Sequence, residues 1–175
     1  MYLVYHFYGQ TLIVLILETL AMFVLWTAAM LLLRGKARRI AALIGAVLAV
    51  VLVLMLTLIR RGFSPDLTPE FIPFSMFFKA DQYPDFWREL YLNIMLFVPL
   101  GLSLPYVLSG KVKHNVLVMI AAGFGLSVFV EIVQLIYVIG KFEIDDMIMN
   151  LIGVSLGTLS FLLFSLIRRK CGKKE

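Results

Sequence analysis

The chain alternates between five long apolar stretches and shorter polar connections. Each stretch holds about 20 residues, enough to cross a hydrocarbon core of roughly 30 Å as a helix that rises about 1.5 Å per residue. The five stretches cover residues 11–33, 40–59, 90–108, 116–139 and 147–167. Strands of a membrane barrel would be about ten residues long with alternating polarity, whereas these runs are longer and apolar on every side. The pattern therefore predicts an all-α, polytopic membrane bundle with five transmembrane helices.

The composition excludes other classes of protein. Hydrophobic residues make up 62% of the 175 residues and charged residues 15%, whereas typical globular chains contain about 45–50% apolar residues. A soluble domain of this length has too little interior to hide so much apolar surface. An ordinary soluble domain, a disordered chain and a nucleic-acid-binding module are all excluded. Only two charged side chains, Glu18 and Glu131, fall inside the five stretches.

Lysine and arginine are concentrated in alternate connections, as is typical of cytoplasmic loops. Eleven of the 16 basic residues fall on one side of the predicted bundle. These are Arg34, Lys36, Arg38, Arg39, Lys111, Lys113, Arg168, Arg169, Lys170, Lys173 and Lys174. The N-terminus is therefore expected outside and the C-terminus in the cytoplasm. The net charge of +5 reflects this inside-positive bias, and no nucleic-acid partner is expected.

Few motifs point to a cofactor or to processing. No basic region typical of a signal peptide precedes the first apolar stretch, which is therefore expected to stay in the protein. Cys171 is the single cysteine, so an intrachain disulfide is excluded. His6 and His114 stand alone, and the sequence contains no metal-ligand spacing, no phosphate-binding glycine loop and no Ser/His/acid set. We expect no cofactor and no metal.

The longest connection, predicted to be external, is rich in proline and aromatic residues. Between residues 71 and 87 it carries seven aromatic side chains, a residue type that gathers at membrane interfaces. A long connection of this kind in a compact protein is usually functional. Residues 63–89 are therefore expected at the outer headgroup layer, either as a simple anchor or as a lid over a site.

The fourth stretch carries an ionisable group inside the membrane, where such a group is costly unless it is paired or functional. Gln134 lies three residues after Glu131 and shares its face of the helix. Gly123, Ser127 and Glu131 recur every four residues, which forms a stripe of small and polar side chains. Because such stripes mark contacts between membrane helices, Glu131 is expected to point into the bundle.

The start of the fifth stretch combines acidic and small residues. Asp145 and Asp146 stand where a helix N-terminus favours negative charge. Asp146 and Asn150 are one turn apart, on a face that continues through Gly153 and Gly157. These two glycines form a GxxxG pattern, which permits close backbone approach either inside the bundle or in a dimer.

The third stretch carries Asn93 near its outer end, followed by Pro99, Gly101 and Pro105. A proline inside a helix removes a hydrogen bond and bends the helix. In a membrane, a neighbouring group or a water molecule must then satisfy the freed carbonyl. Helical rise places the polar residues of the third, fourth and fifth stretches in the outer half of the membrane. We therefore expect an outward-facing polar cluster made of Asn93, Glu131, Gln134, Asp146 and Asn150.

Two alternatives stay open: cation binding by the carboxylates, and a purely structural role for the cluster. Glu131, Asp145 and Asp146 carry the oxygen ligands that a divalent cation prefers, although their spacing does not predict a metal site. Glu18, in the first stretch, has no such polar companions on its face, and we expect a structural pair with a basic or amide group. The cluster residues themselves are either ligand-binding groups or simple interhelical hydrogen bonds.

Four short stretches resemble the VanZ-like family of bacterial membrane proteins. They read FIPF at 71–74, NIMLFVPLG at 93–101, SVFVEIVQL at 127–135 and EIDDMIMNLIGVSLG at 143–157. They run in the order of the family and together cover the external segment and the last three spans. On this resemblance, the chain divides into two N-terminal helices (1–62) without a distinctive match, the external segment (63–89), a three-helix core (90–169) and a basic tail (170–175).

Carried over position by position, the family pattern marks both structural and polar positions. The structural positions are Pro73, Pro99, Gly101, Gly153 and Gly157, and the polar, ligand-binding positions are Asn93, Glu131, Gln134, Asp145, Asp146 and Asn150. Lys141 stands where many members carry arginine, so the charge is kept but the bidentate fork is lost. The resemblance implies a multi-pass protein of the bacterial cell membrane, associated with low-level resistance to glycopeptide antibiotics such as teicoplanin.

Three functions fit these observations. The first is a binding protein whose outward-facing cluster recognises a lipid-linked cell-wall precursor, another membrane lipid or the lipid tail of an antibiotic. The second is a membrane enzyme that acts on a lipid-linked precursor, with Glu131 or Asp146 as general acid or base. The third is a lipid transporter, which the lack of an evident internal repeat makes less attractive. An oligomer is compatible with all three.

Overall fold

The computed structural model describes residues 12–59, 68–78, 80, 86–108, 116–139 and 141–171. Among these residues, five long helices carry the architecture, together with one short helix and one π-helical turn. In chain order these are α2 (Leu12–Leu32), α3 (Gly35–Leu54), the π-helical turn η1 (Met55–Ile59), α4 (Ser75–Phe78), α5 (Phe86–Val107), α6 (Val116–Tyr137) and α7 (Ile144–Cys171). All five long helices are long and apolar enough to cross a membrane.

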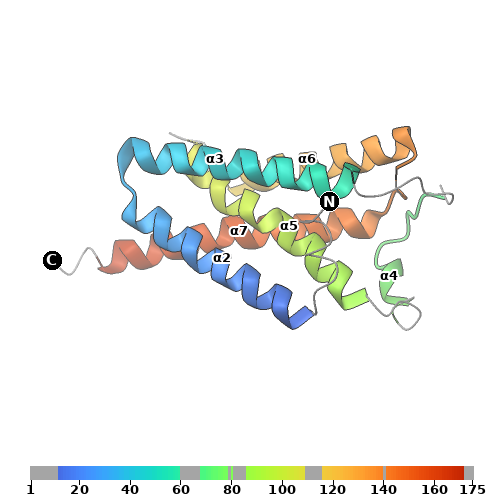
Figure 1. Ribbon diagram of the computed structural model, residues 1–175, viewed down its shortest axis with the longest axis horizontal. Helices are drawn as coiled ribbons and strands as arrows, with labels where there is room; N and C mark the ends of the chain where they lie inside the picture. Colours follow the sequence, from blue (N-terminus) through green and yellow to red (C-terminus); the bar gives the residue numbers. More distant parts are fainter. Residues whose placement is uncertain are drawn as a thin grey trace.

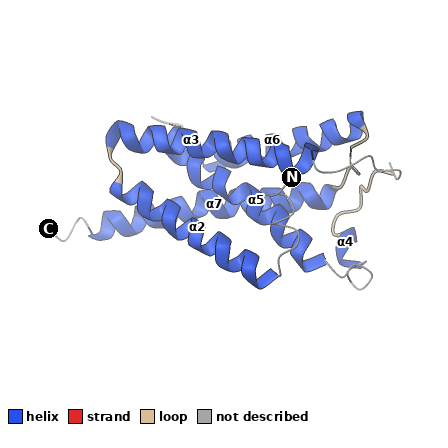
Figure 2. Ribbon diagram, viewed as in Figure 1, coloured by secondary structure: helices blue, strands red, loops and turns tan. Residues whose placement is uncertain are grey.

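The long helices lie side by side in an elongated bundle, with α7 running through its middle (Figure 1). The end of α6, the start of α7 and the short helix α4 lie at one end of the bundle, and the end of α7 lies at the other. Figure 2 shows that helices make up most of the described part of the chain. The predicted all-α bundle with five membrane-spanning helices is confirmed, while the orientation inferred from the basic loops stays a prediction.

Three helices begin earlier than the apolar pattern predicts, and the first of them, α3, starts at Gly35 rather than at residue 40. Helix α5 starts at Phe86 rather than at residue 90, and α7 starts at Ile144 rather than at residue 147. The polar residues in the first turns of α5 and α7 are compatible with a helix because its N-terminus favours negative charge. Asp145 and Asp146 therefore lie inside the first turn of α7.

The packing between α5 and α7 depends on glycine, because the two backbones nearly touch. A Cβ atom added to Gly153 would lie 2.0 Å from the carbonyl oxygen of Ile94, and one added to Gly157 would lie 2.4 Å from that of Val98. From the other side, a Cβ atom on Gly101 would lie 2.3 Å from the carbonyl oxygen of Val154. The GxxxG face therefore serves a contact inside the bundle.

The remaining helices pack around this pair to different extents. Helix α3 contributes Ala46, Ala49 and Val53 to a core that also contains Phe97 and Val130. Helix α2 is peripheral, because only 6% of its span is buried against 44% of the α7 span. Large apolar side chains are exposed along the bundle, which in a membrane protein is the surface that faces lipid.

Pro105 frees a backbone carbonyl that a neighbouring helix then satisfies. Because proline has no N–H, the carbonyl of Gly101, four residues earlier, loses its helical donor. The hydroxyl of Thr158, which is fully buried in α7, donates a hydrogen bond to this carbonyl at 3.4 Å. The expectation that a neighbour satisfies a proline-freed carbonyl is confirmed at this position.

Replacing Thr158 by valine is expected to lower the free energy of unfolding by about 1 kcal/mol, because the buried carbonyl loses its donor. In a Pro105→Ala background, residue 105 regains an N–H that can bond to the Gly101 carbonyl. The cost of Thr158→Val should then largely disappear. Thermal unfolding of the four proteins of this double-mutant cycle measures the difference, and equal costs in both backgrounds would contradict the assignment.

Candidate functional site

The polar residues predicted from sequence meet where α6 ends and α7 begins. Glu131 and Gln134 are each 1% exposed, Asn150 is 4% exposed and Asp146 is 6% exposed. Asn93 of α5 is partly buried and donates a hydrogen bond from Nδ2 to Asp146 Oδ1 at 2.5 Å. Hereafter, the polar cluster means Asn93, Ser127, Glu131, Gln134, Asp146 and Asn150.

Hydrogen bonds and single helical turns join the cluster into one path across three helices. Asn150 lies one turn after Asp146 on α7, and its Nδ2 donates to Ser127 Oγ of α6 at 2.9 Å. Ser127 lies one turn before Glu131, so the path continues along α6. The stripe of small and polar residues predicted on this helix therefore does face the bundle: Gly123, Ser127 and Glu131 are all buried.

The side chain of Glu131 is bonded to the backbone at the start of the next helix, α7. Its Oε2 accepts a hydrogen bond at 3.0 Å from the backbone N–H of Glu143, the residue immediately before α7. A carboxylate at this position also interacts favourably with the positive end of the helix dipole. The buried charge therefore contributes to holding the α6–α7 turn.

Gln134 contacts a different element, the π-helical turn η1 that follows α3. Its Nε2 donates to the carbonyl oxygen of Thr57 at 3.0 Å. Thr57 lies in the π-helical turn η1, a departure from α-helical hydrogen bonding that frequently occurs at functional sites. The sequence did not predict this partner, because every residue type carries a backbone carbonyl.

Two acceptor atoms of the cluster are buried without a hydrogen-bond partner among the described residues. They are Oε1 of Gln134 and Oδ1 of Asn150. Buried polar groups are nearly always satisfied in native proteins, so each exception calls for an explanation. Together with the carboxylates of Glu131 and Asp146, these atoms make the cluster rich in hydrogen-bond acceptors.

Asp145 lies next to the cluster in sequence but contacts the external segment instead. Its Oδ1 accepts from the backbone N–H of Phe74 at 2.5 Å, and its Oδ2 accepts from that of Met76 at 2.8 Å. The hydroxyl of Ser75 adds a longer bond to Oδ2 at 3.3 Å. Phe74 follows Pro73 and has a positive φ of 63°, so this carboxylate holds an otherwise unfavourable turn. Asp145 thus anchors α4 to α7.

A second attachment of the external segment lies just before α7. Glu70 and Glu143 form an isolated parallel β-bridge. The N–H of Glu70 donates to the carbonyl oxygen of Phe142 at 2.8 Å, and the N–H of Ile144 donates to the carbonyl oxygen of Glu70 at 3.2 Å. Lys141 Nζ lies 2.5 Å from Glu70 Oε2 and 3.7 Å from Glu143 Oε1. Lys141 therefore pairs with carboxylates of the protein itself. Sequence reasoning missed Glu70, because a bridge between residues so far apart shows no periodicity.

Some predicted features cannot be placed. His6 and His114 lie outside the described residues, as do Pro65 and Pro84 of the external segment. Within the described part of the chain, no group of three His, Cys, Asp or Glu side chains is arranged to hold a metal ion. Pro99 lies within α5 as predicted, and Ser103 donates a hydrogen bond from Oγ to its carbonyl oxygen at 2.7 Å.

A polar cluster buried between long apolar helices defines a polytopic membrane protein with an internal polar site. Comparison with protein families then identifies the family of this membrane protein. The family model described as VanZ/LLP1 matches residues 46–165, so the chain belongs to this family. The resemblance suggested by the sequence motifs is confirmed, and the match includes every residue of the cluster. No curated protein and no solved structure matches the chain.

Proposed function

We propose that this protein of the bacterial cell membrane binds a membrane-associated ligand at the polar cluster and thereby contributes low-level resistance to glycopeptide antibiotics such as teicoplanin. The observation that carries the proposal is the pair of buried acceptors without described partners, Gln134 Oε1 and Asn150 Oδ1. Leaving such a group unsatisfied costs about 1–3 kcal/mol. A ligand that supplies donors would recover this cost.

The chemistry of the cluster selects the kind of ligand. Carboxylates and amide carbonyls accept hydrogen bonds, so the cluster fits a group that brings hydroxyl or amide N–H donors. It is poorly suited to a bare phosphate, which is itself an anion and an acceptor. The sugar and peptide parts of a lipid-linked cell-wall precursor carry such donors, and so does a glycopeptide antibiotic with a lipid tail.

The simple packing alternative explains only part of the geometry. Interhelical hydrogen bonds in membrane proteins contribute about 0.6–2 kcal/mol each, and the bonds from Asn93 and Asn150 are of this kind. A cluster selected only for packing would not retain two buried unsatisfied acceptors. These two atoms therefore favour a binding role over a purely structural one.

The test is antibiotic susceptibility in a bacterial host that lacks the gene. Wild-type protein, Glu131→Gln and Asp146→Asn are compared at equal membrane abundance, and teicoplanin susceptibility is scored. Both variants are expected to lose protection. The new amides keep a carbonyl oxygen that can accept from Glu143 N–H or from Asn93, so the fold should survive, which thermal unfolding of the purified proteins verifies.

Glu18→Gln provides a matched control. Glu18 is the other carboxylate inside a predicted span, but it lies on α2, outside the region matched by the family model. This variant should protect like the wild type. Full protection by folded Glu131→Gln and Asp146→Asn would overturn the proposal.

The presence of two buried carboxyl groups in one cluster also supports an enzymatic alternative. Glu131 and Asp146 lie on adjacent helices, and either would serve as general acid or base toward a lipid-linked precursor. Mass analysis of lipid extracts distinguishes the two functions. An enzyme converts its lipid to a new product when wild-type protein is expressed, whereas a binding protein leaves lipid chemistry unchanged.

A further inference from the structure

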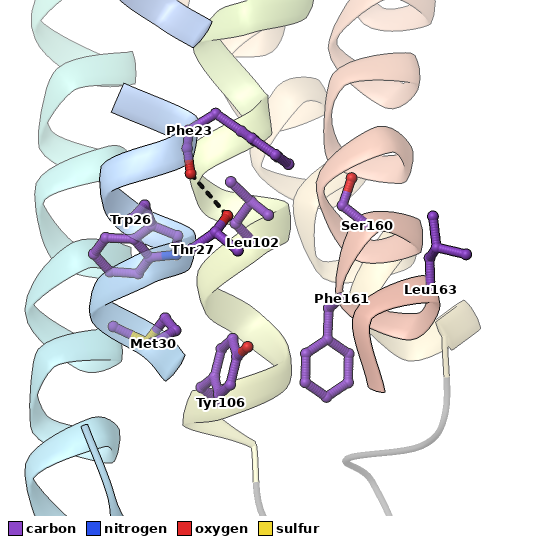
Figure 3. Close-up of a pocket in the computed structure, with 9 residues that line it drawn as sticks. All are labelled: Phe23, Trp26, Thr27, Met30, Leu102, Tyr106, Ser160, Phe161 and Leu163. Carbon is purple, nitrogen blue, oxygen red and sulfur yellow. Dashed lines mark hydrogen bonds between the residues drawn. The ribbon is translucent and has the colours of Figure 1, made fainter. Parts of the chain in front are cut away.

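An apolar cavity of about 190 Å³ lies between α2, α5 and α7, away from the polar cluster. It occupies the C-terminal halves of these helices, whereas the cluster lies where α6 ends and α7 begins. Its walls include Phe23 and Trp26 of α2, Leu102 and Tyr106 of α5, and Phe161 of α7 (Figure 3). The rings of Tyr106 and Phe161 meet edge to face with centroids 5.0 Å apart.

The cavity borders the surface that a membrane protein presents to lipid. Leu163, which also lines it, is 62% exposed, and so the cavity reaches the outside of the bundle. An apolar cavity of about 150 Å³ stays dry and binds a molecule such as benzene. In a membrane, the apolar molecules available to enter from the side are lipid acyl chains.

Trp26 brings a hydrogen-bond donor, its Nε1–H group, to this apolar site. Its six-membered ring packs on α3, since a Cβ atom on Gly45 would lie only 2.1 Å from Trp26 Cη2. The opposite, nitrogen-bearing edge is turned toward the other cavity residues (Figure 3). The Nε1 atom is buried and has no hydrogen-bond partner in the part of the chain that the structure describes.

We propose that this cavity binds the acyl chain of a membrane lipid, with a carbonyl oxygen of its ester group accepting a hydrogen bond from Trp26 Nε1. The cavity holds a segment of about six carbon atoms, by comparison with benzene. The rest of the chain follows the exposed surface beside Leu163. This site is independent of the function proposed for the polar cluster.

Trp26 itself supplies the measurement, because the chain has only two tryptophans. Trp87 is 64% exposed, and Trp87→Phe leaves Trp26 as the sole tryptophan. The probe is the methyl ester of 4,5-dibromostearic acid, added to the purified protein in detergent. Bromine quenches a tryptophan that it contacts, and these two positions lie within the segment of about six carbon atoms that the cavity holds. We expect saturable quenching. Quenching that only rises linearly with probe concentration would overturn the proposed site. The same linear result is expected if a second copy or another part of the chain fills the cavity, and it would overturn the proposal in that case too.

Two serines of α7 give a matched pair of variants. Ser160 lines the cavity and Ser155 does not, and each hydroxyl donates to the carbonyl four residues earlier at 2.7 Å. Ser160→Leu should raise the concentration for half-quenching by about tenfold or more, whereas Ser155→Leu should leave it nearly unchanged. Thr27→Leu fills the cavity from α2 and serves if Ser160→Leu does not fold. Equal quenching of the cavity-filling and control variants would contradict the proposal.

The hydrogen bond to Trp26 is tested with a second probe. A dibrominated octadecane has the same chain but no oxygen acceptor. The ester should reach half-quenching at a concentration several-fold lower than the hydrocarbon does, because only the ester satisfies the buried N–H. Equal concentrations for the two probes would overturn the contact with Nε1.

Discussion

Replacing Gly153 by alanine is expected to destabilise the bundle by about 3 kcal/mol or more, the upper end of the range for overpacked cores. The added methyl group would lie 2.0 Å from the carbonyl oxygen of Ile94. This neighbour is backbone in the middle of α5 and cannot rotate away as a side chain would. The two helices must separate, which also disturbs the contacts at Gly101 and Gly157. Thermal unfolding in detergent should show a decrease of several degrees or more.

Gly125→Ala is the matched control for this prediction. Gly125 also lies in the middle of a membrane helix, α6, but a Cβ atom there would have no heavy atom of the described residues within 4 Å. This variant should unfold at nearly the wild-type temperature. If both alanine variants behaved alike, the close approach of α5 and α7 would not determine the stability of the bundle.

Replacing Asp145 by alanine is expected to release the external segment around α4 while the helix bundle stays folded. The carboxylate accepts from two backbone N–H groups, of Phe74 and Met76, and hydrogen bonds to charged groups contribute about 1.5–3 kcal/mol each. Amide hydrogen exchange at these two residues should therefore accelerate by about tenfold or more. Peptides from the middle of α7 should keep their protection.

Lys141→Met separates this anchor from the second attachment. It removes the ion pair with Glu70, whose side chain is 17% exposed, but leaves the backbone bridge between Glu70 and the α7 entry intact. Partly exposed ion pairs contribute little, about 1 kcal/mol or less. Exchange at Phe74 and Met76 should change only slightly. Unchanged exchange there in Asp145→Ala would contradict the anchoring role.

The spans could be predicted from the sequence because the membrane leaves little choice. A run of about 20 apolar residues must satisfy its own backbone hydrogen bonds, and a helix does so within one segment. The inward faces were also predictable, since Ser127 and Glu131 on one helix, and Asp146 and Asn150 on another, repeat at helical spacing. Helical periodicity shows which residues share a face.

Periodicity does not show which partner a face meets. The bond from Gln134 to the Thr57 carbonyl depends on the backbone of a π-helical turn, and the bridge between Glu70 and Glu143 joins segments far apart in sequence. Asp145 illustrates the same limit, because a neighbouring acid on the same turn, Asp146, contacts a different element. The cavity beside Trp26 is formed by three helices together, so no single residue type in the sequence predicts it.

The six residues from Lys141 to Asp146 hold the polar cluster and the external segment at once. The Glu131 carboxylate accepts from the N–H of Glu143, and the Glu143 backbone forms the β-bridge with Glu70. The Asp145 carboxylate accepts from the N–H of Met76 in α4. A ligand that draws the Glu131 carboxylate away from Glu143 would therefore loosen the start of α7 and its hold on the segment. Thermodynamic reciprocity then requires that opening the segment changes the affinity for this ligand by the same factor. The turn before α7 thus makes the two regions a coupled pair, in which occupancy of the polar cluster is reported by the segment that contains α4.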